Sequence, residues 1–375
     1  MVDLAYKTLL HDKVRFLITV AGVAFAVTLI LVQVGLFIGI LDNATVTIEH
    51  IDADLWITSK NTPNLDFVHQ FPESYVDRVR DTDGVERADD LILAFMNVAL
   101  PTGAQETAVV YALKDFRRWG LPWDVPVGDV DDLKRGPYVL FDESAAKRFG
   151  SFEVGDYREI QSQRLKIIGK TRGAKSFTTT PLAFMDYDRA QTLSPDLLRG
   201  NTSYILVKAK PGTDIPRLER ELQAKLPYND VHTKAAWAAR SRDYWIKNTG
   251  IGFNAFLTVF LGCLVGIVVV AQTLYTSTME HIKEFGTLKA IGGSNADIYG
   301  ILARQAGVSA VVGFVFGLIP SFALRPLVEK GDLKLIIPLE FTGIVFVGTV
   351  VLCMAAAMIS FRKVASIDPG LVFRT

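Results

Sequence analysis

Four long stretches of this 375-residue chain contain no charged residue, and they constrain its fold more than any other feature. The stretches are residues 16–41, 248–279, 305–324 and 341–361. Each is at least as long as the roughly 20 residues that an α-helix needs to cross the hydrocarbon core of a bilayer. Buried helices of large soluble proteins seldom run this far without a charge. The sequence therefore predicts a membrane protein with four transmembrane helices.

The residues between the first and second stretches have the composition of a water-exposed domain. Segment 42–250 holds 28 of the 40 Lys and Arg residues and 31 of the 40 Asp and Glu residues. Asp214 and Pro216 have the positions of an N-cap and a first-turn proline, and they predict the start of a helix. Pieces rich in β-branched and aromatic residues, which are typical of strands, are DADLWIT, LILAFMNVAL, TAVVYAL, YVLFD and SYILVKA. We expect a large mixed α/β domain inserted between helices one and two.

The positive charges next to the spans favour cytoplasmic termini and a large domain outside the cytoplasm. The N-terminal segment, the central loop and the C-terminal tail each carry three Lys or Arg residues, but so does the loop between the third and fourth spans, which keeps the bias small. The expected parts are a cytoplasmic amphipathic segment (1–15), transmembrane helix 1 (16–41), the extracytoplasmic domain (42–250), transmembrane helix 2 (251–276), a cytoplasmic coupling helix and loop (277–304), transmembrane helix 3 (305–324), a short extracytoplasmic loop (325–340), transmembrane helix 4 (341–361) and a cytoplasmic tail (362–375).

Pairs of glycines four residues apart recur in three of the four stretches. This spacing places two glycines on one helical face, where they allow another helix to approach closely. The partner is either a helix of the same chain or a helix of a second copy, and the pattern does not distinguish these alternatives. The predicted helix-packing pairs are Gly35 and Gly39, Gly262 and Gly266, and Gly313 and Gly317.

The connection between the second and third spans is longer than a simple turn requires. In TMEHIKEFGTLKAIGGSNADIYGIL, charged and apolar residues alternate with a helical period up to two glycines, which predicts an amphipathic helix and its end. Ser294 and Asp297 then have the spacing of a capping box and predict the start of the next helix. From the residues alone, this ordered segment either lies on lipid or binds another protein.

The same segment resembles the cytoplasmic loop of FtsX-like, MacB-type (type VII) ABC transporter permeases. An acidic residue, a glycine and a Leu-(Arg/Lys)-Ala-(Ile/Met)-Gly run precede the third span in that family. The order of one span, a large extracytoplasmic domain and three further spans is also similar. Segments that resemble the DevC-like branch along nearly the whole chain are VRFLITVAGVAFAVTLILVQVGLF, DADLWITSK, YVLFDESAAKRFG, YWIKNTGIGF, VVVAQTLYTSTMEHIKEFGTLKAIGG and the terminal DPG.

The resemblance implies a homodimeric permease subunit of an ABC exporter in the bacterial inner membrane, with mechanotransmission to its extracytoplasmic domain. It also implies a periplasmic membrane-fusion adaptor, an outer-membrane channel, and a lipid-like or other hydrophobic substrate. No G-x-x-x-x-G-K-[ST] motif occurs here, so we expect two copies of a separate ATPase that bind ATP and Mg, and no cofactor on this chain. ATPase contacts in the coupling helix are implied at Glu280, Glu284, Phe285, Gly286, Leu288, Lys289, Ala290 and Gly292.

Other functions receive less support from the residues. A non-transporting regulator like FtsX, which passes motion to a cell-wall hydrolase, has the same architecture and remains the alternative. A membrane enzyme is disfavoured, because the five histidines are scattered without metal-ligand spacing and no G-x-S-x-G motif occurs; we name no catalytic or metal-binding residue. The formal net charge of zero gives no indication of a nucleic-acid partner. No Asp, Glu, Lys, Arg or His lies inside a span, which argues against a proton relay.

Overall fold

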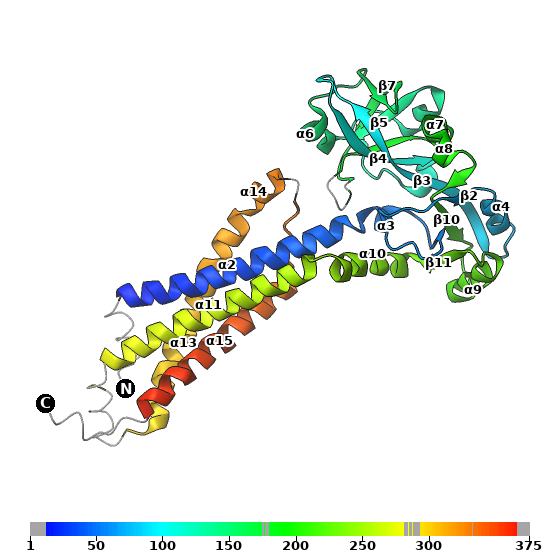
Figure 1. Cartoon of the computed structure of the whole chain (residues 1–375). Helices are drawn as coiled ribbons and strands as arrows, with labels where there is room; N and C mark the ends of the chain where they lie inside the picture. Colours follow the sequence, from blue (N-terminus) through cyan, green and yellow to red (C-terminus); the bar gives the residue numbers. More distant parts are fainter. Residues whose placement is uncertain are drawn as a thin grey trace. The chain divides into compact units, whose positions relative to one another are not determined.

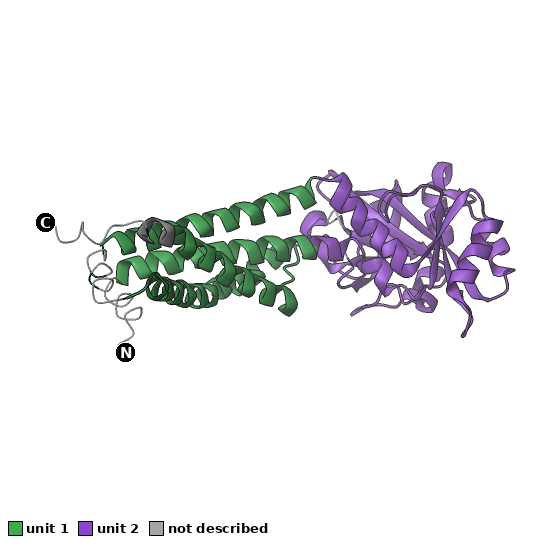
Figure 2. Ribbon diagram, turned by 90° about the horizontal axis from the view of Figure 1, so that it is seen from below, with its two compact units in different colours: residues 1–39, 250–375 green, residues 40–249 purple. Residues whose placement is uncertain are grey.

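The computed structural model describes residues 13–174, 176, 180–280, 284, 287, 293–331 and 333–365, with side chains up to residue 359. The chain forms two compact units (Figure 2), a membrane unit from residues 1–39 and 250–375 and a large domain from residues 40–249. Four of the described helices are long and apolar enough to cross a membrane, and the large domain lies between the first and second of them in the chain. The predicted fold class is therefore confirmed.

Among its described residues, the membrane unit has four long helices and the short helix α14. Helices α2 (Lys13–Asn43), α11 (Ile251–Glu280), α13 (Asn295–Ala323) and α15 (Leu339–Ala365) form a bundle in which successive helices run in opposite directions (Figure 1). Each extends past the predicted span at one end or both, because the polar residues that flank the apolar stretches continue the helix. The segment 325–340 is not a plain loop, since it begins with helix α14 (Arg325–Lys330). Likewise, the described ends of the predicted loop 277–304 belong to α11 and α13.

The large domain contains a nine-stranded sheet of order β11-β1-β10-β3-β4-β8-β5-β7-β6 and a small pair formed by β2 and β9. Its strands are β1 (Leu55–Ser59), β2 (Phe71–Pro72), β3 (Val85–Ala99), β4 (Gln105–Leu113), β5 (Tyr138–Asp142), β6 (Tyr157–Ile160), β7 (Gln163–Thr171), β8 (Leu182–Asp186), β9 (Asn201–Thr202), β10 (Tyr204–Ala209) and β11 (Asn229–Thr233). All five strand-like pieces of the sequence form strands, namely β1, β3, β4, β5 and β10.

Strand β3 connects an open sheet to a small barrel. Its first half pairs with β10, its second half pairs with β4, and Val98 near its end pairs with Ile160 of β6. This last pairing closes β3, β4, β8, β5, β7 and β6 into a barrel. Alternate side chains of β3, including Ile92 and Met96, point into an apolar core that β7 and β8 also line. A second core lies on the other face of the sheet and a third beneath the open part.

Short helices cover the sheet of the large domain. They are α3 (Val46–His50), α4 (Tyr75–Arg80), α5 (Phe116–Trp119), α6 (Ala146–Phe149), α7 (Tyr187–Leu193), α8 (Pro195–Leu198), α9 (Ile215–Lys225) and α10 (Lys234–Asn248). The predicted N-cap of α9 is confirmed, because the Asp214 carboxylate accepts a hydrogen bond of 3.2 Å from the backbone N–H of Arg217. Pro216 lies in the first turn of the same helix.

Candidate functional site

The segment that precedes α13 is the candidate site from the sequence, and two described features flank it. On one side, Arg15 of α2 forms an ion pair with Glu280 of α11. The Arg15 side chain is only 26% exposed, whereas that of Glu280 is 53% exposed. The pair therefore joins the first membrane helix to the second.

On the other side, the predicted capping box is confirmed. The Ser294 hydroxyl accepts a hydrogen bond of 3.2 Å from the backbone N–H of Asp297, and the Asp297 carboxylate accepts one of 2.8 Å from the backbone N–H of Ser294. These bonds satisfy two amide groups that have no partner within the helix. The start of α13 is thus determined by its own local sequence.

Most of the predicted ATPase-contact residues lie outside the described residues. The structure describes Glu280 and Glu284, both of which are exposed. The residues outside the described ranges are Phe285, Gly286, Leu288, Lys289, Ala290 and Gly292. Contact between this segment and an ATPase remains a prediction.

Two of the three glycine pairs face helix α2 of the same chain. A Cβ atom added at Gly313 would lie 2.6 Å from the Val23 side chain, and one at Gly317 would lie 2.8 Å from the Ala24 carbonyl oxygen. The close approach at Gly317 also allows the Thr28 hydroxyl to donate a hydrogen bond of 3.0 Å to the Gly317 carbonyl oxygen. Helix α13 therefore contacts α2 backbone to backbone at this level.

The glycines of α11 contact α2 in the same way. A Cβ atom added at Gly262 would lie 2.9 Å from Leu29, and one at Gly266 would lie 3.2 Å from the Cβ of Ala26. Both pairs thus have the intrachain partner, one of the two alternatives left open by the sequence. Their importance for helix packing remains a prediction for substitution to test.

The spacing of the glycine pair on α2 suggests contact with another helix, but the neighbour of this pair is a different kind of segment. Gly35 and Gly39 lie against segment 333–338, which has no regular secondary structure and lies between α14 and α15 in the chain. The backbone N–H of Ile336 donates a hydrogen bond of 3.1 Å to the Gly35 carbonyl oxygen. Added Cβ atoms would meet the Leu335 side chain at 2.7 Å and the backbone of Lys334. The two glycines leave a flat groove on α2, and a connecting segment without helical side-chain ridges packs into it.

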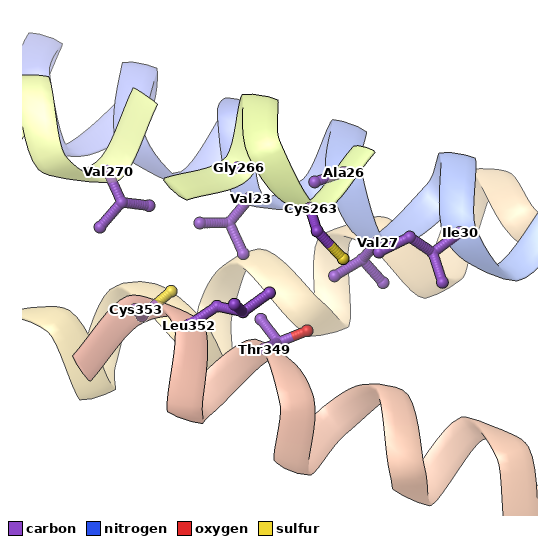
Figure 3. Close-up of a pocket in the computed structure, with 10 residues that line it drawn as sticks. All are labelled: Val23, Ala26, Val27, Ile30, Cys263, Gly266, Val270, Thr349, Leu352 and Cys353. Carbon is purple, nitrogen blue, oxygen red and sulfur yellow. The ribbon is translucent and has the colours of Figure 1, made fainter. Parts of the chain in front are cut away.

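A small cavity lies between α2, α11 and α15 (Figure 3). Its volume of about 20 Å³ is close to the size of one water molecule. The Thr349 hydroxyl donates its hydrogen to the Val345 carbonyl oxygen at 2.7 Å, which leaves few polar partners for a water. The residues that line the cavity are Val23, Ala26, Val27, Ile30, Cys263, Gly266, Val270, Thr349, Leu352 and Cys353. The cavity is too small and too apolar to bind a polar cargo.

Helices α3 and α10, at the two ends of the large domain's chain, are bonded to each other and to one loop. Glu49 of α3 forms an ion pair of 3.6 Å with Arg242 of α10. The Ser241 hydroxyl of α10 accepts a hydrogen bond of 3.2 Å from the backbone N–H of Leu65, and Trp237 of α10 is fully buried in the core. The segments that enter and leave the domain therefore behave as one packed element.

Two carboxylates of the large domain are strongly affected by burial. Asp90 on β3 is 8% exposed, and burial, with a smaller effect of the nearby Glu73 carboxylate, raises its pKa to about 7. Burial alone raises the pKa of Asp66 to about 6. Along the strand, Asp90 lies between Ala88 of one apolar core and Ile92 of another, so packing accounts for its raised pKa.

Within the described ranges, no group of three or more His, Cys, Asp and Glu side chains is arranged to hold a metal ion. The sequence-based expectation that this chain binds no cofactor is not tested by that observation. The described membrane helices are held together mainly by close packing, whereas most of the charged residues lie in the large domain.

Two family profiles together match most of the chain. The family described as MacB-like periplasmic core domain matches residues 16–225. The family described as FtsX-like permease C-terminal matches residues 256–369.

Individual proteins are similar over different lengths. An uncharacterized ABC transporter permease of Mycobacterium bovis is 25% identical over 381 residues, which cover 100% of this chain and 99% of that protein. Another, from Methanocaldococcus jannaschii, is 23% identical over 185 residues, or 47% of this chain and 45% of that protein. The crystal structure of the periplasmic region of MacB from Actinobacillus actinomycetemcomitans aligns with 54% of this chain and 96% of its own, with 14% identity and a TM-score of 0.39.

Proposed function

The chain belongs to the FtsX-like, MacB-type family of ABC transporter permeases, and we propose that it is the membrane subunit of an exporter that transmits ATP-driven motion to its large domain. Similarity to named permeases agrees with a subunit that is not itself an enzyme. The motion would begin at the segment between α11 and α13 and act on a cargo or partner outside the cytoplasm. The cargo that we propose is lipid-like or otherwise hydrophobic.

The observation that carries this proposal is the packing of the bundle around α2. Glycines of α11 and α13 bring those helices into close contact with α2, and the segment 333–338 covers its remaining glycine face. The cavity that the described residues of α2, α11 and α15 enclose holds about 20 Å³, far below the several hundred Å³ of a typical ligand site. A bundle of this kind supports the transmission of movement along its helices better than the passage of a cargo between them.

The partners follow from the family rather than from any contact in the structure. We propose two copies of a separate ATPase that bind ATP and Mg, a second copy of this chain, and surrounding membrane lipids. A periplasmic membrane-fusion adaptor and an outer-membrane channel complete the exporter, as in the DevC-like branch. The corresponding location is the inner membrane of a bacterium, with the large domain on the extracytoplasmic side.

The test is recovery of the ATPase with variants of the coupling segment. Phe285→Ala removes the predicted apolar anchor, and we expect at least a tenfold loss of ATPase in pull-downs from native membranes, since buried aromatic anchors contribute about 2 kcal/mol or more to an interface. Phe256→Ala is the matched control, because Phe256 is 67% exposed on the apolar face of α11. Equal recovery with both variants would contradict the assignment of this segment as the ATPase contact.

The match to an FtsX-like C-terminal region supports one alternative function. In this second proposal the same motion activates an extracytoplasmic cell-wall hydrolase, and no cargo is exported. The pull-down distinguishes the two, because an adaptor protein recovered with the chain supports export, whereas a coiled-coil hydrolase supports regulation.

A further inference from the structure

Three aromatic side chains of the large domain form a cluster next to the point where the chain leaves this domain. Phe67 belongs to the loop between β1 and β2, whereas Tyr244 and Trp245 belong to the C-terminal part of α10. The ring centroid of Phe67 lies 5.5 Å from that of Tyr244 and 5.9 Å from that of Trp245. The rings of Tyr244 and Trp245 meet edge to face at 5.5 Å. Residues that are far apart in the sequence thus form one aromatic surface.

The loop that carries Phe67 is fixed by hydrogen bonds to buried groups. The fully buried side chain of Asn64 accepts bonds of 2.9 Å from the backbone N–H groups of Asp66 and Phe67. The Tyr204 hydroxyl donates a bond of 2.8 Å to the carbonyl oxygen of Leu65. Because these bonds involve only the backbone at 65–67, the loop holds its shape without any contribution from the Phe67 ring.

The loop nevertheless presents the Phe67 ring to its surroundings. Leu65 is 4% exposed and Val68 packs against the same apolar core, whereas Phe67 is 47% exposed. A single exposed apolar side chain is common on protein surfaces. A phenylalanine that is held in place against Tyr244 and Trp245 extends a larger apolar surface, however, and such surfaces mark a contact with another molecule or with lipid.

The sequence continues from this cluster directly into the membrane. The charge-free stretch 248–279 begins three residues after Trp245. These residues are helical, so at a rise of about 1.5 Å per residue the distance along the helix axis is about 4.5 Å. The interfacial layer of a bilayer is about 5 to 8 Å thick on each side, and Tyr and Trp are enriched in it. Chain connectivity therefore brings Tyr244 and Trp245 to this layer, and Phe67 contacts both.

We propose that Phe67, Tyr244 and Trp245 form a lipid-contact surface of the large domain, which enters the interfacial layer of the leaflet on the domain's own side. A phenylalanine ring loses contact with water there, while the amphipathic rings of Tyr and Trp suit the boundary between headgroups and acyl chains. The contact is made by a loop of the domain and is distinct from the lipid around the membrane helices. It does not depend on what the transporter carries.

The test measures the depth of position 67 in nanodiscs of phosphatidylcholine. A spin label is attached to Phe67→Cys in the full-length chain without its native cysteines. Its collisions with oxygen, which concentrates in hydrocarbon, are compared with its collisions with a water-soluble nickel chelate. Phe95→Cys is the matched control, because Phe95 is 49% exposed and lies in the half of β3 that pairs with β4, whereas α10 packs against α3, β1 and β11.

We expect the ratio of oxygen to nickel collisions to be at least about threefold higher at position 67 than at position 95, since the interfacial layer adjoins hydrocarbon. A ratio no higher than at position 95 would place the ring in water and overturn the inference. Infrequent collisions with both agents at position 67 would show that protein, such as a second copy of the chain, covers the surface, and would overturn it equally.

A second measurement leaves Phe67 in place. Nanodiscs of phosphatidylcholine brominated in its acyl chains should quench part of the tryptophan fluorescence, because bromine quenches only rings that it approaches closely. Trp56, Trp119 and Trp237 are fully buried in the domain, so Trp245→Phe should remove more than half of this quenching. Quenching that is absent from the wild type, or unchanged in Trp245→Phe, would contradict a lipid contact at this surface.

Discussion

Replacement of Asp90 by asparagine should remove most of the pH dependence of the large domain's stability near neutral pH. The pKa of Asp90 is raised to about 7 in the folded chain, whereas an unfolded aspartate has a pKa of about 3.9. The folded state therefore binds the proton more tightly than the unfolded state does. Its contribution is fully present below about pH 4 and is lost as the pH rises through 7.

The magnitude follows from the difference between the two pKa values. About three pKa units at 1.36 kcal/mol each correspond to a total loss of about 4 kcal/mol, of which about 2 to 3 kcal/mol falls between pH 5 and pH 8. One carboxylate oxygen of Asp90, Oδ1, is buried without a hydrogen-bond partner among the described residues, which agrees with a neutral acid. An asparagine side chain has the same shape but does not ionise, so the Asp90→Asn variant should be about 2 to 4 kcal/mol more stable than the wild type at pH 8.

Urea unfolding of the detergent-solubilised chain, followed by tryptophan fluorescence, measures this effect directly. All five tryptophans lie within the large domain, so the signal excludes the membrane helices; they are Trp56, Trp119, Trp123, Trp237 and Trp245. Asp83→Asn is the control, because Asp83 is exposed. Asp66, whose pKa is raised to about 6, accounts for a further slope at lower pH. If Asp90→Asn keeps the wild-type slope between pH 5 and pH 8, the pKa of Asp90 is not raised into this range.

Two further predictions concern the membrane unit. Gly317→Ala should destabilise the bundle by about 1 to 3 kcal/mol, because the new methyl group meets α2, whereas Gly343→Ala, with no atom within 4 Å of the added Cβ, should stabilise it by up to about 1 kcal/mol. Thermal unfolding in detergent compares the two variants, and equal midpoints would show that close packing at Gly317 is unimportant. Single cysteines at Ser151 and Ser294, in a chain without its native cysteines, should react with an impermeant thiol reagent from opposite sides of the membrane; reaction of both in intact cells would contradict the topology.

Features determined by neighbouring residues were predictable, and features that depend on distant partners were not. The capping box of Ser294 and Asp297 and the N-cap at Asp214 are local, and both are confirmed. The hairpin between β6 and β7 was missed, because its turn residues Gln161 and Ser162 adopt positive φ without glycine or asparagine to indicate it. Closure of the barrel depends on a pairing between Val98 and Ile160, which no local pattern reveals.

The candidate site shows the same division. Glycine spacing indicated where helices approach closely, but the neighbours of Gly317 lie almost 300 residues earlier in the chain. For Gly35, the spacing suggested a helix, but the neighbour is a segment without regular secondary structure, since the motif describes one surface and not what covers it. The ion pair of Arg15 with Glu280 was missed because each charge alone is typical of a residue that flanks a membrane span.

The central place of α2 has a consequence for how the protein is made. This helix is synthesised before α11, α13 and segment 333–338, whose residues cover its faces. The large domain alone separates α2 from α11 by more than 200 residues, which a ribosome translates in roughly 10 to 40 seconds. During that interval α2 must reside in the bilayer or beside the translocon with its glycine faces covered only by lipid. The high mean hydropathy of α2, 2.5, favours its residence in lipid without its partner helices. Nascent chains that end before α11 would leave its glycine faces open to helices of other proteins.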